Sequence, residues 1–287
     1  MTLWHDAFYK FVALPQADTT VQTLQTRCEQ ISTSVDELLG SILIAPEGIN
    51  GMIASSKAGL AAFHDMLAVP EFEGCFADID VKRSPCNAKP FGRLKIKRKR
   101  EIVPLGIDGV DATARTGINV SPEDWRELLE QDDVVVIDNR NDFEVRLGQF
   151  KGAINPHVNN FRDFPAYVEE NLEQWEGKRV AMYCTGGIRC EKTSSWLLDK
   201  GLEVYQLEGG ILGYFAKIPD PERDWDGECF VFDNRVALDT NLQETATKLE
   251  DIYDAAEEDE RWRLERAKQL SQTELGQIEP SQAEPTE

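Results

Sequence analysis

The segment VAMYCTGGIRCEK (residues 180–192) decides how the second half of the chain folds. Its first five residues form an apolar run, which is typical of a buried strand. Two glycines then let the chain turn, and a helix is expected from about Cys190 to Lys200. A strand that turns directly into a helix predicts a parallel α/β unit, with Cys184 at the turn.

This turn is a candidate anion site. Backbone N–H groups at a strand-to-helix turn, together with the positive end of the helix dipole, point at whatever lies in the mouth of the turn. These donors and Arg189 stabilise a thiolate, which predicts a lowered pKa and a reactive nucleophile at Cys184. Cys184 is therefore the candidate catalytic residue, with a buried structural cysteine as the alternative. The candidate active-site loop consists of Thr185, Gly186, Gly187, Ile188 and Arg189.

The segments around the loop extend the α/β pattern over residues 119–226. Ser121 is placed to cap a helix, and Pro122 suits the first turn of that helix. VVVID (134–138) is a continuous β-branched run, and EVYQL (203–207) is a further short strand. Strands that alternate with helices predict a parallel sheet.

The first 103 residues have a different pattern. Strand, helix, strand, strand, helix and strand are expected in that order, at residues 7–13, 17–32, 41–45, 51–55, 56–68 and 78–82. This order predicts a ferredoxin-like sandwich, the architecture of acylphosphatases. Residues 94–97 add an edge strand with its lysines outward. The fold class is therefore α/β, with an α+β domain (1–103) before the parallel one.

Composition sets the remaining boundaries. Residues 104–118 are rich in glycine and small side chains and are predicted to link the two domains. Residues 227–270 form a C-terminal extension, in which 241–270 are predicted as one charged amphipathic helix. Residues 271–287 are rich in Gln, Glu and Pro and are expected to be disordered.

Charge is segregated along the chain. The net charge of −21 by itself argues against a nucleic-acid partner, because phosphates repel acidic surfaces. One segment without acidic residues is nevertheless strongly basic and is the candidate RNA-binding segment. Its basic residues are Lys82, Arg83, Lys89, Arg93, Lys95, Lys97, Arg98, Lys99 and Arg100. The alternative is a solvated edge strand that its lysines protect from aggregation.

Several classes of site find no support in the sequence. Six cysteines without a CxxC pair, and only three histidines, predict neither a disulfide framework nor a metal site. There is no GxGxxG motif, and no flavin, nicotinamide or haem site is recognised. No apolar run approaches the roughly 18 residues of a membrane span, and no signal-peptide pattern is seen. A cytoplasmic protein with reduced thiols and no membrane partner is expected.

Other polar residues near the loop are further candidates for supporting roles. Asp138 and Arg140 follow a strand end, where they either shape the pocket or form an internal ion pair. Cys190 is either a resolving thiol or a packing residue in the first helical turn. His157 is either a proton-transfer group or a hydrogen-bonded surface histidine.

The loop and its surroundings resemble known families. CTGGIR (184–189) resembles the six-residue active loop of rhodanese domains, and the match covers roughly residues 120–225. More specifically, the chain is similar to the TrhO family over about residues 5–240. The stretches that carry this similarity are APEGINGMIA (45–54), KRSPCNAKPFGRLKIKRKREIVPLG (82–106), RNDFEVRLGQFKGAINP (140–156), CTGGIRCEK (184–192), EGGILGY (208–214) and GECFVFDNRVALD (227–239).

The TrhO resemblance implies an oxygen-dependent tRNA hydroxylase that converts the wobble uridine, position 34, to 5-hydroxyuridine. It carries the functional cysteine onto Cys184, makes molecular oxygen a co-substrate and makes the tRNA anticodon loop the partner, with no DNA expected. The reductant is not identified. Longer family members end in a cysteine-rich region, whereas this chain has no cysteine after Asp239, so no role is carried over to its extension.

Two other reactions use related loops. Related phosphatases place five residues between cysteine and arginine, whereas four separate Cys184 from Arg189, which disfavours phosphatase activity. A sulfurtransferase that carries a persulfide on Cys184 stays open as the alternative. For hydroxylation, the hypothesis is that the Cys184 thiolate, or its persulfide, adds to C6 of uracil and activates C5 toward oxygen.

Overall fold

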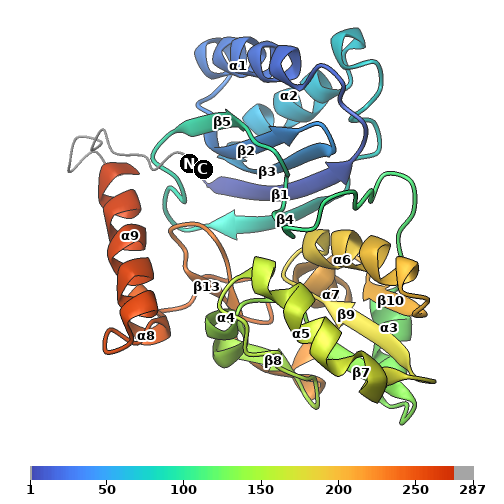
Figure 1. The fold of residues 1–287 in the computed structure, drawn as a ribbon. Coiled ribbons are helices and arrows are strands. Elements are labelled where there is room, and N and C mark those ends of the chain that lie inside the picture. The colour runs from blue at the N-terminus through green and yellow to red at the C-terminus, as the bar shows by residue number, and fades with distance from the viewer. Residues whose placement is uncertain (1, 275–287) are drawn as a thin grey trace.

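The computed structural model describes residues 2–274, and it contains two main sheets that follow one another along the chain (Figure 1). The first is a mixed five-stranded sheet with the order β4-β1-β3-β2-β5. The second is a parallel four-stranded sheet with the order β6-β10-β9-β7. The predicted fold class is therefore confirmed.

The N-terminal domain follows the predicted order of elements. They are β1 (Leu3–Phe11), α1 (Ala17–Ser34), β2 (Leu39–Ala45), β3 (Gly48–Ser55), α2 (Lys57–Leu67), the 3-10 turn Pro70–Phe72, β4 (Val81–Cys86) and β5 (Leu94–Arg98). The strand expected at 78–82 begins later than predicted, at Val81. Both helices pack on one face of the sheet, where Leu24 and Phe63 are fully buried with Phe8.

The other face of this sheet is turned toward the second domain (Figure 1). Strand register fixes which side chains lie on this face, because residues paired across strands point to the same side. One row of paired residues runs across all five strands. In order, it consists of Lys82, Ala7, Met52, Ser41 and Lys95. We call this side of the sheet the open face.

The second domain contains the predicted alternation of strands and helices. Its elements are β6 (Ile118–Val120), α3 (Pro122–Leu129), β7 (Val134–Asp138), α4 (Asp142–Leu147), β8 (Gly148–Phe150), the 3-10 turn Phe161–Asp163, α5 (Phe164–Asn171), the 3-10 turn Leu172–Trp175, β9 (Arg179–Tyr183), α6 (Ile188–Asp199), β10 (Val204–Leu207) and α7 (Gly210–Lys217). As predicted, Ser121 caps α3, because its hydroxyl accepts a hydrogen bond from the Asp124 amide.

The C-terminal extension differs from the prediction. After the 3-10 turn Pro221–Arg223, it forms β11 (Trp225–Gly227), β12 (Cys229–Phe230) and β13 (Ala237–Leu238), and then two separate helices, α8 (Leu249–Ile252) and α9 (Glu258–Glu274). The single helix expected over 241–270 is wrong. The Asp239 carboxylate accepts hydrogen bonds from backbone amides at residues 241 and 243, and such bonds compete with a helix. The predicted disordered tail falls outside the described residues from 275 onward, while 271–274 belong to α9.

A buried cation joins the two domains. Lys192, on α6, lies 2.8 Å from a carboxylate oxygen of Glu47 and 2.5 Å from one of Glu101, and it also donates to the Val103 carbonyl. The lysine is almost fully buried, whereas the two carboxylates keep partial contact with water. A buried ammonium is costly unless acceptors surround it, so moving α6 away from the β2–β3 turn would leave the Lys192 charge without its partners. The contact therefore holds α6 against that turn.

We expect Lys192→Met to lower the free energy of unfolding by about 2 kcal/mol, less than for a fully enclosed pair because Glu47 and Glu101 stay partly hydrated. Denaturant-induced unfolding of the whole chain measures the effect. The matched control is Lys200→Met just after the same helix, where the half-exposed pair with Glu169 should contribute less than about 1 kcal/mol. Equal midpoints for the two variants would contradict this role of Lys192.

Candidate active site

Cys184 directly follows β9, and the loop after it turns its amides toward the sulfur. The Gly187 amide donates a hydrogen bond to Cys184 Sγ over 3.2 Å. Gly187 has a φ of +101°, which L side chains rarely adopt, and a Cβ there would lie 2.8 Å from the Tyr9 hydroxyl. The turn therefore requires glycine at this position.

The surroundings of the sulfur favour the thiolate. Burial by itself raises the pKa of the Cys184 thiol, but this is outweighed by the hydrogen bond from the Cys190 thiol, the charge of Arg189 and the amides of both residues. The resulting pKa of Cys184 is about 5. At neutral pH the side chain is thus a buried thiolate, which is the reactive form of cysteine.

Arg189 is held in place by a buried carboxylate. Its guanidinium makes two hydrogen bonds to Glu144, at 2.7 and 2.8 Å. Although burial opposes the charged form of Glu144, the charge of Arg189 and its hydrogen bonds keep the pKa of this carboxyl below its ordinary value. The two hydrogen bonds fix the position of the guanidinium, so its positive charge stays beside the loop.

The segment after β10 supports the loop from its other side. The amides of Ile211 and Leu212 donate to the carbonyls of Cys184 and Thr185. A Cβ at Gly210 would lie 2.5 Å from the Cys184 carbonyl oxygen, so only glycine allows this close approach. The loop is thereby fixed before any substrate arrives.

Asp138 and Arg140 form the internal ion pair that was one of the two alternatives. Both side chains are fully buried, their closest atoms are 2.6 Å apart, and Arg140 also donates to the Gly148 carbonyl. Neither residue lines the cavity in front of Cys184. Their position supports the end of β7 next to the strand that carries the cysteine.

A cavity of about 680 Å³ separates the loop from the open face, a size typical of small-molecule sites. The N-terminal domain contributes Tyr9, Asn50 and Lys82 to its lining, and the C-terminal extension contributes Phe232 and Asp233. Of these residues, only Lys82 was predicted from the sequence to belong to a site. The alternation along β1, which places Tyr9 on the face opposite Phe8, is the sequence signal that could have identified Tyr9.

The two domains also meet at a polar contact beside the sulfur. The Tyr9 hydroxyl donates to Glu191 over 2.8 Å, and the Lys82 ammonium lies 5.0 Å from the centre of the Tyr9 ring. Burial, and then the negative charge of Cys184, raise the pKa of Glu191. The first domain thus supplies an aromatic ring and an ammonium group, itself paired with Asp80 over 2.7 Å, to the lining of the cavity in front of Cys184.

The candidate basic residues do not form one cluster. Lys82 alone among them lines the cavity, whereas its neighbour Arg83 points to the helix-covered face and binds Asp6. Lys89 pairs with Glu37, and Arg98 lies 3.6 Å from Asp18. Lys95 and Lys97 lie on β5, on the open face with Lys82. Arg93 precedes β5, and Lys99 and Arg100 follow it.

His157 lies away from the sulfur. Its ring is exposed, hydrogen bonds to Asp142 over 2.8 Å, and does not line the cavity. It is the surface histidine that was one of the two alternatives. Among residues 2–274, no group of three or more His, Cys, Asp or Glu side chains is arranged to hold a metal ion.

Cys184 lies at the end of a parallel strand, in a loop whose amides point at its sulfur, and four residues separate it from Arg189. We call this loop the nest. The arrangement defines a rhodanese-type domain. Family comparison agrees: residues 121–217 match the rhodanese-like domain, and residues 5–102 match the UPF0176 acylphosphatase-like domain. A tRNA uridine(34) hydroxylase from Legionella pneumophila (strain Paris) is 41% identical over 248 residues, covering 86% of this chain and 94% of that protein. The chain belongs to the UPF0176/TrhO family.

Several solved structures are similar to part of this chain. A rhodanese-related protein from Thermoplasma volcanium is 24% identical, with a TM-score of 0.27. The match covers 35% of this chain and 93% of that protein. A rhodanese-like domain protein from Staphylococcus aureus is 22% identical, with a TM-score of 0.29. The match covers 34% of this chain and 90% of that protein.

The thiolate can be tested by the pH dependence of alkylation with a small reagent. Wild-type reactivity should rise as pH increases through about 5 and be constant near neutrality. Cys190→Ala removes one donor and should move the midpoint upward by about 1 to 2 pH units, since a hydrogen bond to a charged group contributes about 1.5–3 kcal/mol. Cys190→Ser keeps a donor and is the control. A wild-type midpoint near 9 would refute the thiolate.

Proposed function

We propose that this protein hydroxylates uridine 34 of tRNA to 5-hydroxyuridine in a reaction that consumes molecular oxygen, with Cys184 as the reactive group. The observation that carries the proposal is the stabilised thiolate of Cys184 in a cavity whose opposite wall is the open face. The tRNA uridine(34) hydroxylase of Legionella pneumophila, similar over most of both chains, supports the same reaction here.

The thiolate suits the first chemical step. Its sulfur adds to C6 of the uracil ring, and the electrons of the C5–C6 double bond move toward the C4 carbonyl, so C5 becomes able to attack oxygen. A neutral thiol could not do this efficiently, and the low pKa of Cys184 keeps the sulfur ionised at neutral pH. The remaining loop residues, from Thr185 to Arg189, hold the sulfur in place.

The substrate enters between the two domains. A target base in the anticodon loop is unpaired, so turning it into the cavity costs only a few kcal/mol. The row from Lys82 to Lys95 crosses the open face over about 19 Å, at about 4.8 Å for each strand spacing. Backbone phosphates next to the base can therefore contact Lys95 at one end of this row, whereas Lys82 at the other end lies mostly buried beside the cavity and pairs with Asp80.

The site of action follows from the substrate. Transfer RNA reads codons on the ribosome in the cytoplasm, and we place the protein there. Within residues 2–274, no helix has the length and apolar character to cross a membrane.

Replacing Cys184 with Ser should abolish 5-hydroxyuridine. The measurement is nucleoside mass spectrometry of bulk tRNA from a deletion strain complemented with wild-type or Cys184→Ser protein. The control is Cys75→Ser, which changes a half-buried cysteine in the N-terminal domain. Full hydroxylation by the Cys184 variant would exclude the thiolate mechanism, and loss of a thiolated nucleoside instead would favour the sulfurtransferase.

Reversing the charge of Lys97 should weaken tRNA binding and reduce the slope of log affinity against log salt by about 1, since each phosphate contact contributes about 0.7 to 0.9. The control is Lys178→Glu, which makes the same charge change in front of β9, at the opposite end of that strand from Cys184. Equal effects of the two substitutions would show that net charge, and not the open face, decides binding.

A further inference from the structure

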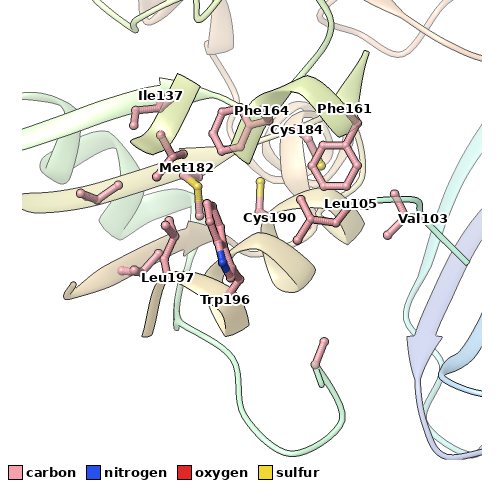
Figure 2. Close-up of a cluster of buried hydrophobic side chains, with 14 of the residues drawn as sticks. Val103, Leu105, Ile137, Phe161, Phe164, Met182, Cys184, Cys190, Trp196 and Leu197 are labelled. Carbon is pink, nitrogen blue, oxygen red and sulfur yellow. The ribbon is translucent and has the colours of Figure 1, made fainter. Parts of the chain in front are cut away.

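A second thiol lies against the reactive one. Cys190 is in the first turn of α6 and is fully buried, and it packs in the same core cluster as Cys184, whose thiolate it helps to stabilise. Figure 2 shows both sulfur atoms in one apolar layer, with Phe161, Leu105 and Trp196 around them. Stabilising the Cys184 thiolate needs only a hydrogen-bond donor at this position, which a serine would also provide, so it does not by itself require a second thiol.

The electron balance of hydroxylation gives Cys190 a task. Inserting one atom of molecular oxygen into uridine and releasing the other as water consumes two electrons and two protons. Oxidation of two thiols to a disulfide releases two electrons and two protons. We propose that Cys190 is the resolving thiol of this enzyme and that the Cys184–Cys190 pair is the direct two-electron donor for hydroxylation. This inference rests on the proposed function.

Each step can be written with its bonds. Cys184 Sγ adds to C6, C5 forms a bond to molecular oxygen, and with a proton this gives a C5 hydroperoxide. Loss of the C5 proton expels the Cys184 thiolate and restores the double bond. The thiolate then attacks the outer hydroperoxide oxygen, which leaves 5-hydroxyuridine and a sulfenic acid on Cys184. Finally, Cys190 attacks that sulfur, forming the disulfide and releasing water.

The geometry suits this division of labour. Cys190 does not line the cavity, so it does not compete for the substrate, and it lies in the same buried cluster as Cys184, whose sulfur it must reach (Figure 2). The other cysteines are separated from the nest: Cys229 points to the Phe230 carbonyl, and three more lie in the N-terminal domain.

The ionisation of the two thiols supports the order of events. Burial, and then the negative charge of Cys184, raise the pKa of Cys190 well above its ordinary value, so Cys190 stays a protonated hydrogen-bond donor in the resting protein. Oxidation of Cys184 to a neutral sulfenic acid removes that negative charge. Cys190 then ionises more readily at the stage at which it must act as a nucleophile.

A single-turnover experiment tests the proposal. Reduced full-length protein is freed of reductant, mixed with excess unmodified tRNA without oxygen, and then exposed to air. We expect one 5-hydroxyuridine per protein molecule, loss of two thiols, and no further product until a dithiol reductant is added. Trypsin cleaves after Arg189, so a Cys184–Cys190 disulfide should appear as two peptides joined by sulfur.

The matched variant is Cys190→Ser, which keeps a hydrogen-bond donor and so keeps the Cys184 thiolate, as pH-dependent alkylation would verify. It should still form one product per protein, but it should lose only one thiol, as a sulfenic acid that a selective trap captures before any reductant is added. Cys75→Ser should behave as wild type. Product formation by Cys190→Ser without a trapped sulfenic acid, or two intact thiols after product formation in wild type, would overturn the inference alone. Absence of 5-hydroxyuridine in wild type would overturn the proposed function together with it.

Discussion

A negative charge on a buried sulfur is the constraint around which this protein is organised. Such an anion is costly in the protein interior unless donors and positive charge surround it. The Gly187 amide, the Cys190 thiol and Arg189 meet that requirement at Cys184. Glu144 in turn keeps Arg189 in position. The need for glycine at the turn and the burial of this ion pair both follow from stabilising one thiolate.

The same constraint explains why the two domains are joined rigidly. The thiolate faces a cavity whose other wall belongs to the first sheet, so the distance between the domains determines the shape of the site. Lys192, two residues after Cys190 on α6, forms the ion cluster with Glu47 and Glu101 that joins the two domains beside the site. The element that carries the nest therefore also carries the contact that positions the first domain.

The basic residues that are close in the sequence of this acidic chain are not all close in the structure. Sequence proximity grouped Lys82 with Arg83, but a strand sends neighbours to opposite faces, and only Lys82 reaches the cavity. Lys82 and Lys95 are thirteen positions apart in sequence yet belong to one row across the sheet. The helix expected over 241–270 is interrupted for a related reason, because Asp239 and Asp254 accept hydrogen bonds from nearby backbone amides, and such bonds compete with a helix.

The sequence alone determined both domain architectures, the nest and its cysteine, because strand and helix periodicity and glycine spacing act over a few residues. Only the tertiary structure decided that Tyr9 and Phe232 share a cavity with Cys184, that Asp138 and Arg140 pair internally, and that Cys190 packs in the same buried cluster as Cys184. Those relations depend on how strands pair and how domains dock. Contacts between residues far apart in a chain are set by packing of the whole molecule, which local patterns do not encode.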